Sequence, residues 1–200
     1  MKQVTSNTTD DHALMRQVGE GDAAAYRELV RRHAPTCLRF AERMLGNRSD
    51  AEDVMQETCL KLWREAAHWQ PNARLTTWLY RVVWNACIDH RRRARPERHD
   101  EDMARFVDDR PPIDDQLASL EASERVRHAM QTLPERQRAA ITLCYYEGIG
   151  GDEAAAILQI SPGALHASLH RARQQLKERL KENPDATTGT DRGRIHVHAT

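Results

Sequence analysis

The sequence predicts an all-α protein built from two small helical domains. Apolar residues recur every three or four positions along most of the 200-residue chain, and no alternating strand pattern stands out. Glycine and proline are sparse, with nine and eight residues. The length allows one large or two small domains, and a hydrophobic content of 40% is enough for compact helical cores.

The distribution of charge favours two domains that face nucleic acid. The 30 basic and 30 acidic residues cancel, so the net charge alone says nothing about a partner. Basic residues exceed acidic ones in residues 23–95 and again in 125–182, whereas acidic residues dominate 96–124. We therefore expect an N-terminal segment 1–22, a first domain 23–95, an acidic flexible linker 96–119, a second domain 120–182 and a disordered tail 183–200.

Other classes of protein find little support. The four cysteines have no zinc spacing, and their apolar neighbours indicate reduced core thiols. His166 and His170 lie one helical turn apart and could hold a metal, but no third ligand is near them in sequence, so exposed or DNA-facing histidines are favoured. No catalytic, metal or cofactor pattern is present, which predicts a non-enzyme without cofactors. No apolar run approaches the ~20 residues of a membrane span, and we expect a cytoplasmic protein.

Residues from Met1 to about Asp10 are polar and expected to be frayed, and one short and one long helix follow, of which the long one opens the first domain. Asp22 is a plausible N-cap for the long helix, and Gly46-Asn47 ends it. Ser49 and Glu52 then predict a capping box for the next helix. Its buried stripe should comprise Ala51, Val54, Met55, Thr58, Leu62 and Ala66, which leaves Asp50, Asp53, Gln56, Glu57 and Arg64 largely outward.

A Pro/Asn loop at residues 70–73 separates that helix from one that starts near Thr76 or Thr77. One face of the new helix is apolar, and it ends in consecutive arginines. Arginines neutralise phosphates, and an asparagine beside aromatic rings can bond and stack on base edges, so this face predicts nucleic-acid contact. Trp78 on its own is better explained as a core residue. The polar face comprises Trp78, Arg81, Asn85, Asp89 and Arg92.

The second domain carries a helix-turn-helix pattern. Thr132 with Glu135 predicts a second capping box, and Gly148 closes the helix that follows. A short alanine-rich helix at 152–158, a tight turn, and a long helix capped by Ser161 complete the pattern. The long helix ends in a basic run, which favours DNA binding.

Four segments together resemble the extracytoplasmic-function (ECF) class of bacterial sigma factors: DAEDVMQETCLKLWREA, LTTWLYRVVWNACIDHRRR, LPERQRAAITLCYYEG and SLHRARQQLKERL. They stand in that family's order and spacing. The resemblance implies a subunit that binds core RNA polymerase, directs it to promoters and initiates transcription. It also implies promoter DNA as a partner, double-stranded at −35 and single-stranded at −10, and an anti-sigma factor.

The resemblance also implies site residues. Polymerase would be bound by Asp50, Asp53, Gln56, Glu57, Leu60, Trp63 and Arg64. The −10 strand would be held by Asn72, Arg74, Trp78, Arg81, Trp84, Asn85, Asp89, Arg91, Arg92 and Arg93. The −35 duplex would be read by Ser161, Gly163, Ala164, His166, Ser168, His170, Arg171 and Arg173.

The sequence departs from the family pattern at two places. Gly150-Gly151 replaces a serine or threonine followed by a bulky residue, and His166-Ala167-Ser168 replaces a more basic triplet, which should weaken or alter −35 binding. Trp84 is also unusual and would add a stacking platform. Two rival hypotheses remain: a helix-turn-helix regulator that never touches polymerase, and a small metal hydrolase that uses His and Cys side chains.

Overall fold

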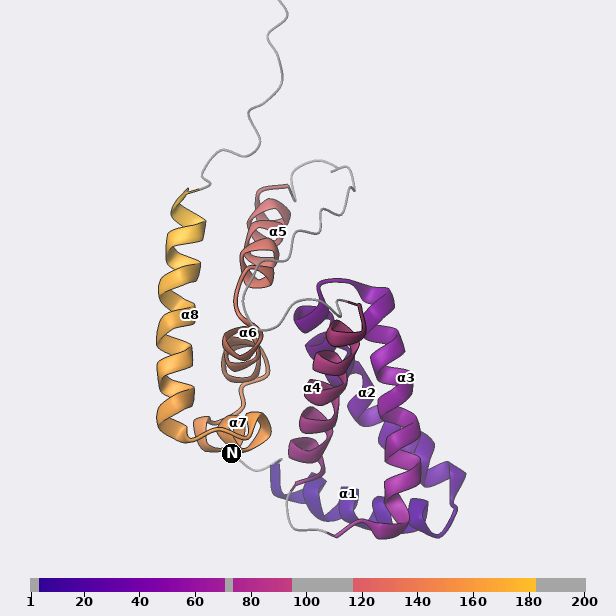
Figure 1. Ribbon diagram of the computed structural model, residues 1–200. Helices are drawn as coiled ribbons and strands as arrows, with labels where there is room; N and C mark the ends of the chain where they lie inside the picture. Colours follow the sequence, from indigo (N-terminus) through magenta and orange to yellow (C-terminus); the bar gives the residue numbers. More distant parts are fainter. Residues whose placement is uncertain (1–3, 71–73, 95–116, 183–200) are drawn as a thin grey trace, which may run out of the picture.

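The computed structural model describes residues 4–70, 74–94 and 117–182, and within them every element is helical. The first domain is a bundle of α1 (Val4–Gly19), α2 (Ala23–Leu45), α3 (Arg48–Glu65) and α4 (Leu75–Ala94), with a 3-10 turn η1 (Ala66–His68) after α3. In Figure 1, α2 lies between α3 and α4. Since α1 begins at Val4, the expectation of a frayed start as far as Asp10 was wrong for residues 4–10.

The second domain comprises α5 (Leu117–Gln131), α6 (Glu135–Ile141), a π-helical turn η2 (Thr142–Tyr146), α7 (Gly151–Leu158) and α8 (Pro162–Glu182). Helix α8 forms the outer edge of the molecule, while α6 and α7 lie between it and the first domain (Figure 1). Helix α5 begins inside the expected linker, and the rest of that linker and the whole predicted tail lie outside the described residues.

Helix ends follow the sequence at some positions and depart from it at others. Asp22 caps α2 by accepting hydrogen bonds from the amides of Ala24 (2.7 Å) and Ala25 (3.3 Å). Gly46 ends α2 in the left-handed conformation at φ 84°, which a residue without a Cβ adopts at little cost. The chain after it is extended, so Asn47 accepts from the amide of Asp50 at 2.7 Å and caps α3. The predicted capping box from Ser49 was therefore wrong.

The second predicted capping box was also wrong. Thr132 donates its hydroxyl hydrogen bond back to the carbonyl of Ala129 at 2.8 Å, and Pro134, without a side-chain cap, precedes α6. Ser161 does cap α8, because its hydroxyl oxygen accepts from the amide of Ala164 at 3.2 Å.

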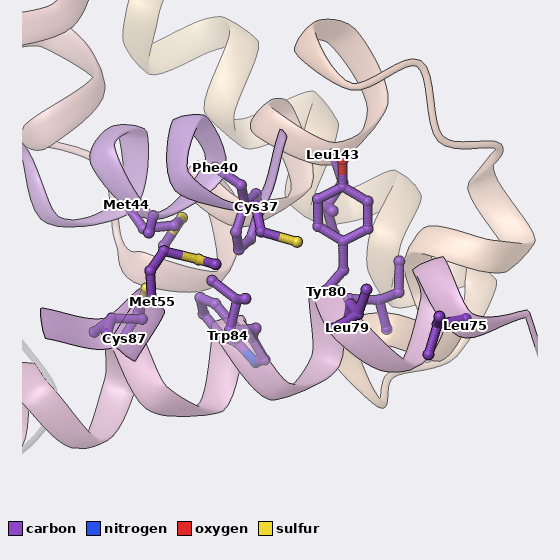
Figure 2. Close-up of a cluster of buried hydrophobic side chains, with 14 of the residues drawn as sticks. Cys37, Phe40, Met44, Met55, Leu75, Leu79, Tyr80, Trp84, Cys87 and Leu143 are labelled. Atoms are coloured by element: carbon purple, nitrogen blue, oxygen red, sulfur yellow. The ribbon is translucent and has the colours of Figure 1, made fainter. Parts of the chain in front are cut away.

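The apolar core of the first domain combines large side chains from α2, α3 and α4. Figure 2 shows Phe40 and Met44 of α2 close to Met55 of α3 and to Trp84 of α4. All six residues predicted for the buried stripe of α3 are buried. The same cluster continues into the second domain through Leu143 of η2, which lies beside Tyr80. One hydrophobic core therefore reaches across both domains.

Candidate functional site

One face of α3 is exposed although it carries large apolar side chains. Leu60 is 55% exposed and Trp63 is 41% exposed, and neither contributes to the core. They lie in line with Asp53, Gln56 and Glu57, at the spacing of three and four residues that places side chains on one side of a helix. Exposed apolar residues rimmed by polar ones are typical of a protein-binding surface. We call this set, completed by Arg64, the α3 stripe.

The ring of Trp63 is held in place from within the first domain. The ring of Tyr26 on α2 meets it edge-on, with 5.2 Å between the ring centroids. The Tyr26 hydroxyl donates to the carbonyl of Cys59 at 3.1 Å, and burial raises the pKa of this tyrosine. The hydroxyl therefore stays protonated and keeps this hydrogen bond. The bond fixes the tyrosine ring, against which the exposed indole of Trp63 packs.

Two members of the predicted polymerase surface already have partners within the chain. Asp50 is half-buried, with a carboxylate oxygen 3.3 Å from His90 Nε2 of α4. Glu57 accepts from Arg93 at 3.0 Å across the gap between α3 and α4. Both contacts join α3 to the last turns of α4, so Asp50 and Glu57 are less available than the other members of this surface.

The outer face of α4 carries three exposed polar residues at helical spacing, Asn85, Asp89 and Arg92. Arg74 is exposed at the beginning of the helix, and Arg93 is exposed at its end. Amide donors, an acceptor and guanidinium groups along one helix can bond both base edges and phosphates. The predicted residue Asn72 lies outside the described residues.

The two tryptophans of α4 are not exposed. Trp78 is half-buried, and its ring packs against Trp69 with 5.4 Å between centroids, in agreement with its interpretation as a core residue. Trp84 is only 7% exposed and points into the core beside Met55 (Figure 2). The expectation that Trp84 provides a stacking platform was wrong: it stands on the inner side of the helix, one residue from exposed Asn85.

Three arginines predicted for the −10 site make contacts with the second domain, and the longest of these contacts joins Arg74 to Glu153 of α7 at 4.0 Å. Arg81 is half-buried and donates to the carbonyl of Ala156 in α7 at 3.1 Å. Arg91 lies 3.1 Å from a carboxylate oxygen of Glu135 in α6. In this arrangement of the domains, the guanidinium groups of Arg81 and Arg91 are both engaged with the second domain.

The second domain forms a helix-turn-helix from α7 and α8. Gln159 turns the chain in the left-handed conformation at φ 55°, and the cap at Ser161 starts the second helix directly afterwards. Ser168 is buried and donates its hydroxyl to the carbonyl of Ala164 at 2.9 Å, so the expected role of its side chain in reading DNA is not available here. The other predicted residues are exposed: Ser161, Gly163, Ala164, His166, His170, Arg171 and Arg173.

Sequence reasoning missed three features of this domain. Tyr145 and Tyr146 are exposed at the end of η2, and the Tyr145 hydroxyl accepts from Arg173 at 3.2 Å. Two adjacent aromatics just before Gly148 were the available signal. Arg138 is 1% exposed and Glu147 is largely covered, yet nothing in the local pattern separates them from surface charges.

The described residues contain no group of three His, Cys, Asp or Glu side chains that could hold a metal ion. His166 and His170 are both exposed on α8. None of the described helices is long and apolar enough to cross a membrane. In the described part of the chain the four cysteines are free, as expected for core thiols: Cys37 and Cys87 are buried, and Cys59 and Cys144 are half-buried.

Comparison with known proteins places both domains. Residues 29–97 match the Sigma-70 region 2 family, and residues 123–176 match the Sigma-70 region 4 family. The ECF RNA polymerase sigma factor SigE of Mycolicibacterium smegmatis is 35% identical over 173 residues, which cover 84% of this chain and 67% of SigE. The ECF sigma factor SigF of Caulobacter vibrioides is also 35% identical, over 89% of this chain and 98% of its own.

Solved structures agree with the sequence comparison. The structure of CnrH in complex with the cytosolic domain of CnrY superimposes with a TM-score of 0.66 and 26% identity, over 87% of this chain and 99% of CnrH. The assignment rests on two family matches in the expected order, on relatives that align over most of this chain, and on a shared fold. The chain belongs to the ECF class of sigma factors, the alternative sigma factors that direct RNA polymerase to promoters and initiate transcription.

Proposed function

We propose that this sigma factor uses three separate surfaces, each with its own binding partner, in transcription initiation. The α3 stripe docks on core RNA polymerase, the outer face of α4 contacts the unwound −10 strand, and α8 reads the −35 duplex. The observation that carries the proposal is the exposure of Leu60 and Trp63 in line with acidic and amide side chains. A monomer gains nothing from exposing these two side chains, whereas a partner that covers them gains apolar burial.

The proposed −10 surface depends on charge and on base contacts in different ways. Arg92 and Arg93 would neutralise phosphates before and after strand opening, while Asn85 has an amide that suits exposed base edges. Opening costs a few kcal/mol per unstacked base, so contacts made only with the open strand favour the open complex.

The proposed −35 surface is the exposed side of α8. Arg171 and Arg173 would contact phosphates, and the start of the helix, with Gly163, Ala164 and His166, would lie in the major groove. The small residues there allow a close approach to the bases but supply few bonds. This fits the expectation of a weak or altered −35 preference.

An anti-sigma factor is a further proposed partner. CnrH, which shares this fold over nearly its whole length, was solved with the cytosolic domain of CnrY. We also place the chain in the cytoplasm, where core polymerase and promoter DNA are found.

The docking proposal is tested by the affinity of purified variants for core polymerase. Trp63→Ala should weaken binding about tenfold, because a large ring in the middle of an interface is often a dominant contact. Reversing Asp53 and Glu57 to lysine should weaken binding as well. Glu65→Lys is the matched control, because Glu65 is an exposed acid on the same helix but off the stripe. Unchanged affinity of Trp63→Ala, with its helical content intact, would refute the docking site.

A further inference from the structure

The side of the first domain that carries the beginning of α4 is covered by the second domain. Residues of α2 and α4 face α6, η2 and α7 there (Figure 1), and Leu143 lies fully buried in the shared core. We propose that this face binds the carboxylates Glu147 and Glu153 of the chain's own second domain, and that the closed form so produced excludes the −10 strand. The inference rests on the proposed use of α4 in DNA binding.

Glu147 makes the more enclosed of the two contacts. One carboxylate oxygen lies 2.9 Å from Arg43 Nη1 of α2, and the other accepts from the Tyr80 hydroxyl of α4 at 3.1 Å. Its side chain is only 4% exposed. A buried carboxylate needs a cation and hydrogen-bond donors to offset its lost hydration, and here both come from the first domain. The contact therefore depends on the two domains being together.

Glu153 engages the first turn of α4. One oxygen accepts the hydroxyl of Thr77, and the other lies 4.0 Å from Arg74 Nη1. One turn further along the helix, Arg81 donates to the carbonyl of Ala156. Arg74 and Arg81 are two of the groups that the family resemblance implies for holding the −10 strand. An acid and a carbonyl of α7 thus occupy donors that would otherwise meet phosphates and bases.

Within the part of the chain that the structure describes, the closed form leaves two buried hydrogen-bond donors unsatisfied, which favours opening of the two domains. Arg81 Nε and Arg91 Nη1 are buried without a hydrogen-bond partner among the described residues. A buried donor without a partner costs free energy, so these arginines weaken the closed form relative to one in which both are fully bonded. DNA phosphates or water would satisfy them after opening.

Closure lowers the apparent affinity for DNA by a simple rule. If only a fraction of the molecules is open, the apparent dissociation constant for the −10 strand is the intrinsic constant divided by that fraction. Any change that weakens closure without touching the DNA-binding groups should therefore tighten DNA binding. Glu147 and Glu153 meet this condition because they contact the closed form and are absent from the proposed DNA surfaces.

The test uses full-length protein and a fluorescein-labelled single-stranded oligodeoxynucleotide of random sequence. Glu147→Gln combined with Glu153→Gln should bind this probe about tenfold more tightly than the wild type. The same variant should have a larger radius of gyration by small-angle X-ray scattering. Asp152→Asn combined with Glu178→Gln is the matched control, since it removes the same charge from two exposed sites of α7 and α8.

The two readouts separate this inference from the proposed function. Equal tightening in the test and control variants would show a general charge effect and overturn the inference, as would a wild-type radius of gyration already equal to that of the double variant. Expansion of the double variant without tighter binding would also overturn it. Adding Arg81→Ala to the double variant should remove the gain. If the gain survives Arg81→Ala, closure stands and the proposed role of Arg81 in DNA binding fails.

Discussion

The two domains fill their interiors in different ways. The first packs large side chains such as Phe40, Met44 and Leu62 from neighbouring helices around its own centre. The second contains a larger share of buried alanines, including Ala139, Ala140, Ala154, Ala155 and Ala172, beside larger residues such as Met130, Ile157 and Leu165, and directs Leu143 toward the first domain. Small side chains bury less apolar area each. We therefore expect the first domain to fold independently, and the stability of the second domain to depend on its interface with the first.

Substitution of Arg138 should cause the largest loss of stability. Its guanidinium is buried at the interface between the domains, and within the described residues it donates only to oxygen atoms of neutral groups. Burial lowers its pKa to about 9, so it remains charged at neutral pH. Arg138→Met should destabilise the second domain by about 4 kcal/mol, because several buried oxygens lose their donor at once. Its acceptors are the carbonyls of Met44, Met130, Gln131 and Leu133 and the side-chain oxygen of Gln131.

Amide hydrogen exchange measures this loss separately in each domain. Protection should fall in α6 and α8 and stay near the wild-type level in α3. Arg136→Met, two residues away and exposed, is the control and should change stability by less than about 0.5 kcal/mol. Equal losses in both domains would contradict the idea that the first is self-sufficient.

Substitution of Leu143 should cause the next largest loss of stability, and it tests directly whether the two domains share a core. Leu143→Ala should cost about 3 kcal/mol, since its side chain is fully buried between η2 and the Tyr80 ring. Leu60→Ala removes the same atoms from an exposed site and should cost little. Urea unfolding of the two variants would make the comparison, and a small cost for Leu143→Ala would show that the domains do not share a core in solution.

Alkaline pH should destabilise the first domain through its two buried thiols. Burial raises the pKa of Cys37 to about 12, from an ordinary value of 9.0, and raises that of Cys87 as well. In the unfolded chain both thiols ionise near pH 9, while in the fold they stay protonated. Stability is therefore lost as pH rises above about 9, by roughly 1 kcal/mol per thiol for each pH unit.

Urea unfolding at pH 8 and pH 10 would measure this loss. Cys37→Ala should reduce the pH dependence, whereas Cys144→Ala, at a half-buried position in the second domain, should change it less. A pH dependence that is the same in both variants would assign the effect to other groups.

Substitutions of helix caps should cause the smallest losses of stability, and one cap can be tested in each domain. Asp22→Ala should cost about 1 kcal/mol, since two amides lose their acceptor. Ser161→Ala removes one longer bond of 3.2 Å and should cost about half as much. Thermal unfolding followed by circular dichroism would rank them, and the reverse order would mean that the start of α8 carries more of the stability than its contacts indicate.

Local patterns predicted much of the fold because their causes lie within a few residues. The buried stripe of α3 follows from helical spacing, and the caps at Asp22, Gly46 and Ser161 follow from side chains close to the helix ends. The capping box at Ser49 failed for a related reason. Gly46 leaves the chain extended at Asn47, so the helix starts before the serine is reached.

The candidate site was predictable where it depends on one helix and not where it depends on two domains. The outward positions of Asp53, Gln56, Glu57 and Arg64 could be read from periodicity, whereas Leu60, Trp63 and the residues of α8 were expected only from the family resemblance. The burial of Trp84 was not predicted, because an aromatic residue on a helix edge can face either way until a neighbour packs on it. The contacts of Glu147, Glu153 and Arg138 join residues far apart in sequence, and no local pattern carries that information.

The π-helical turn η2 has a consequence for how this chain can change during evolution. A π turn places one extra residue in a helical turn and rotates everything after it. Deleting a single residue from 142–146 would restore an ordinary helix and turn the following side chains by about 100°. Glu147 would then no longer point at Arg43 and Tyr80. A one-codon deletion would thus uncouple the two domains while α8, with each of its exposed side chains, stays intact.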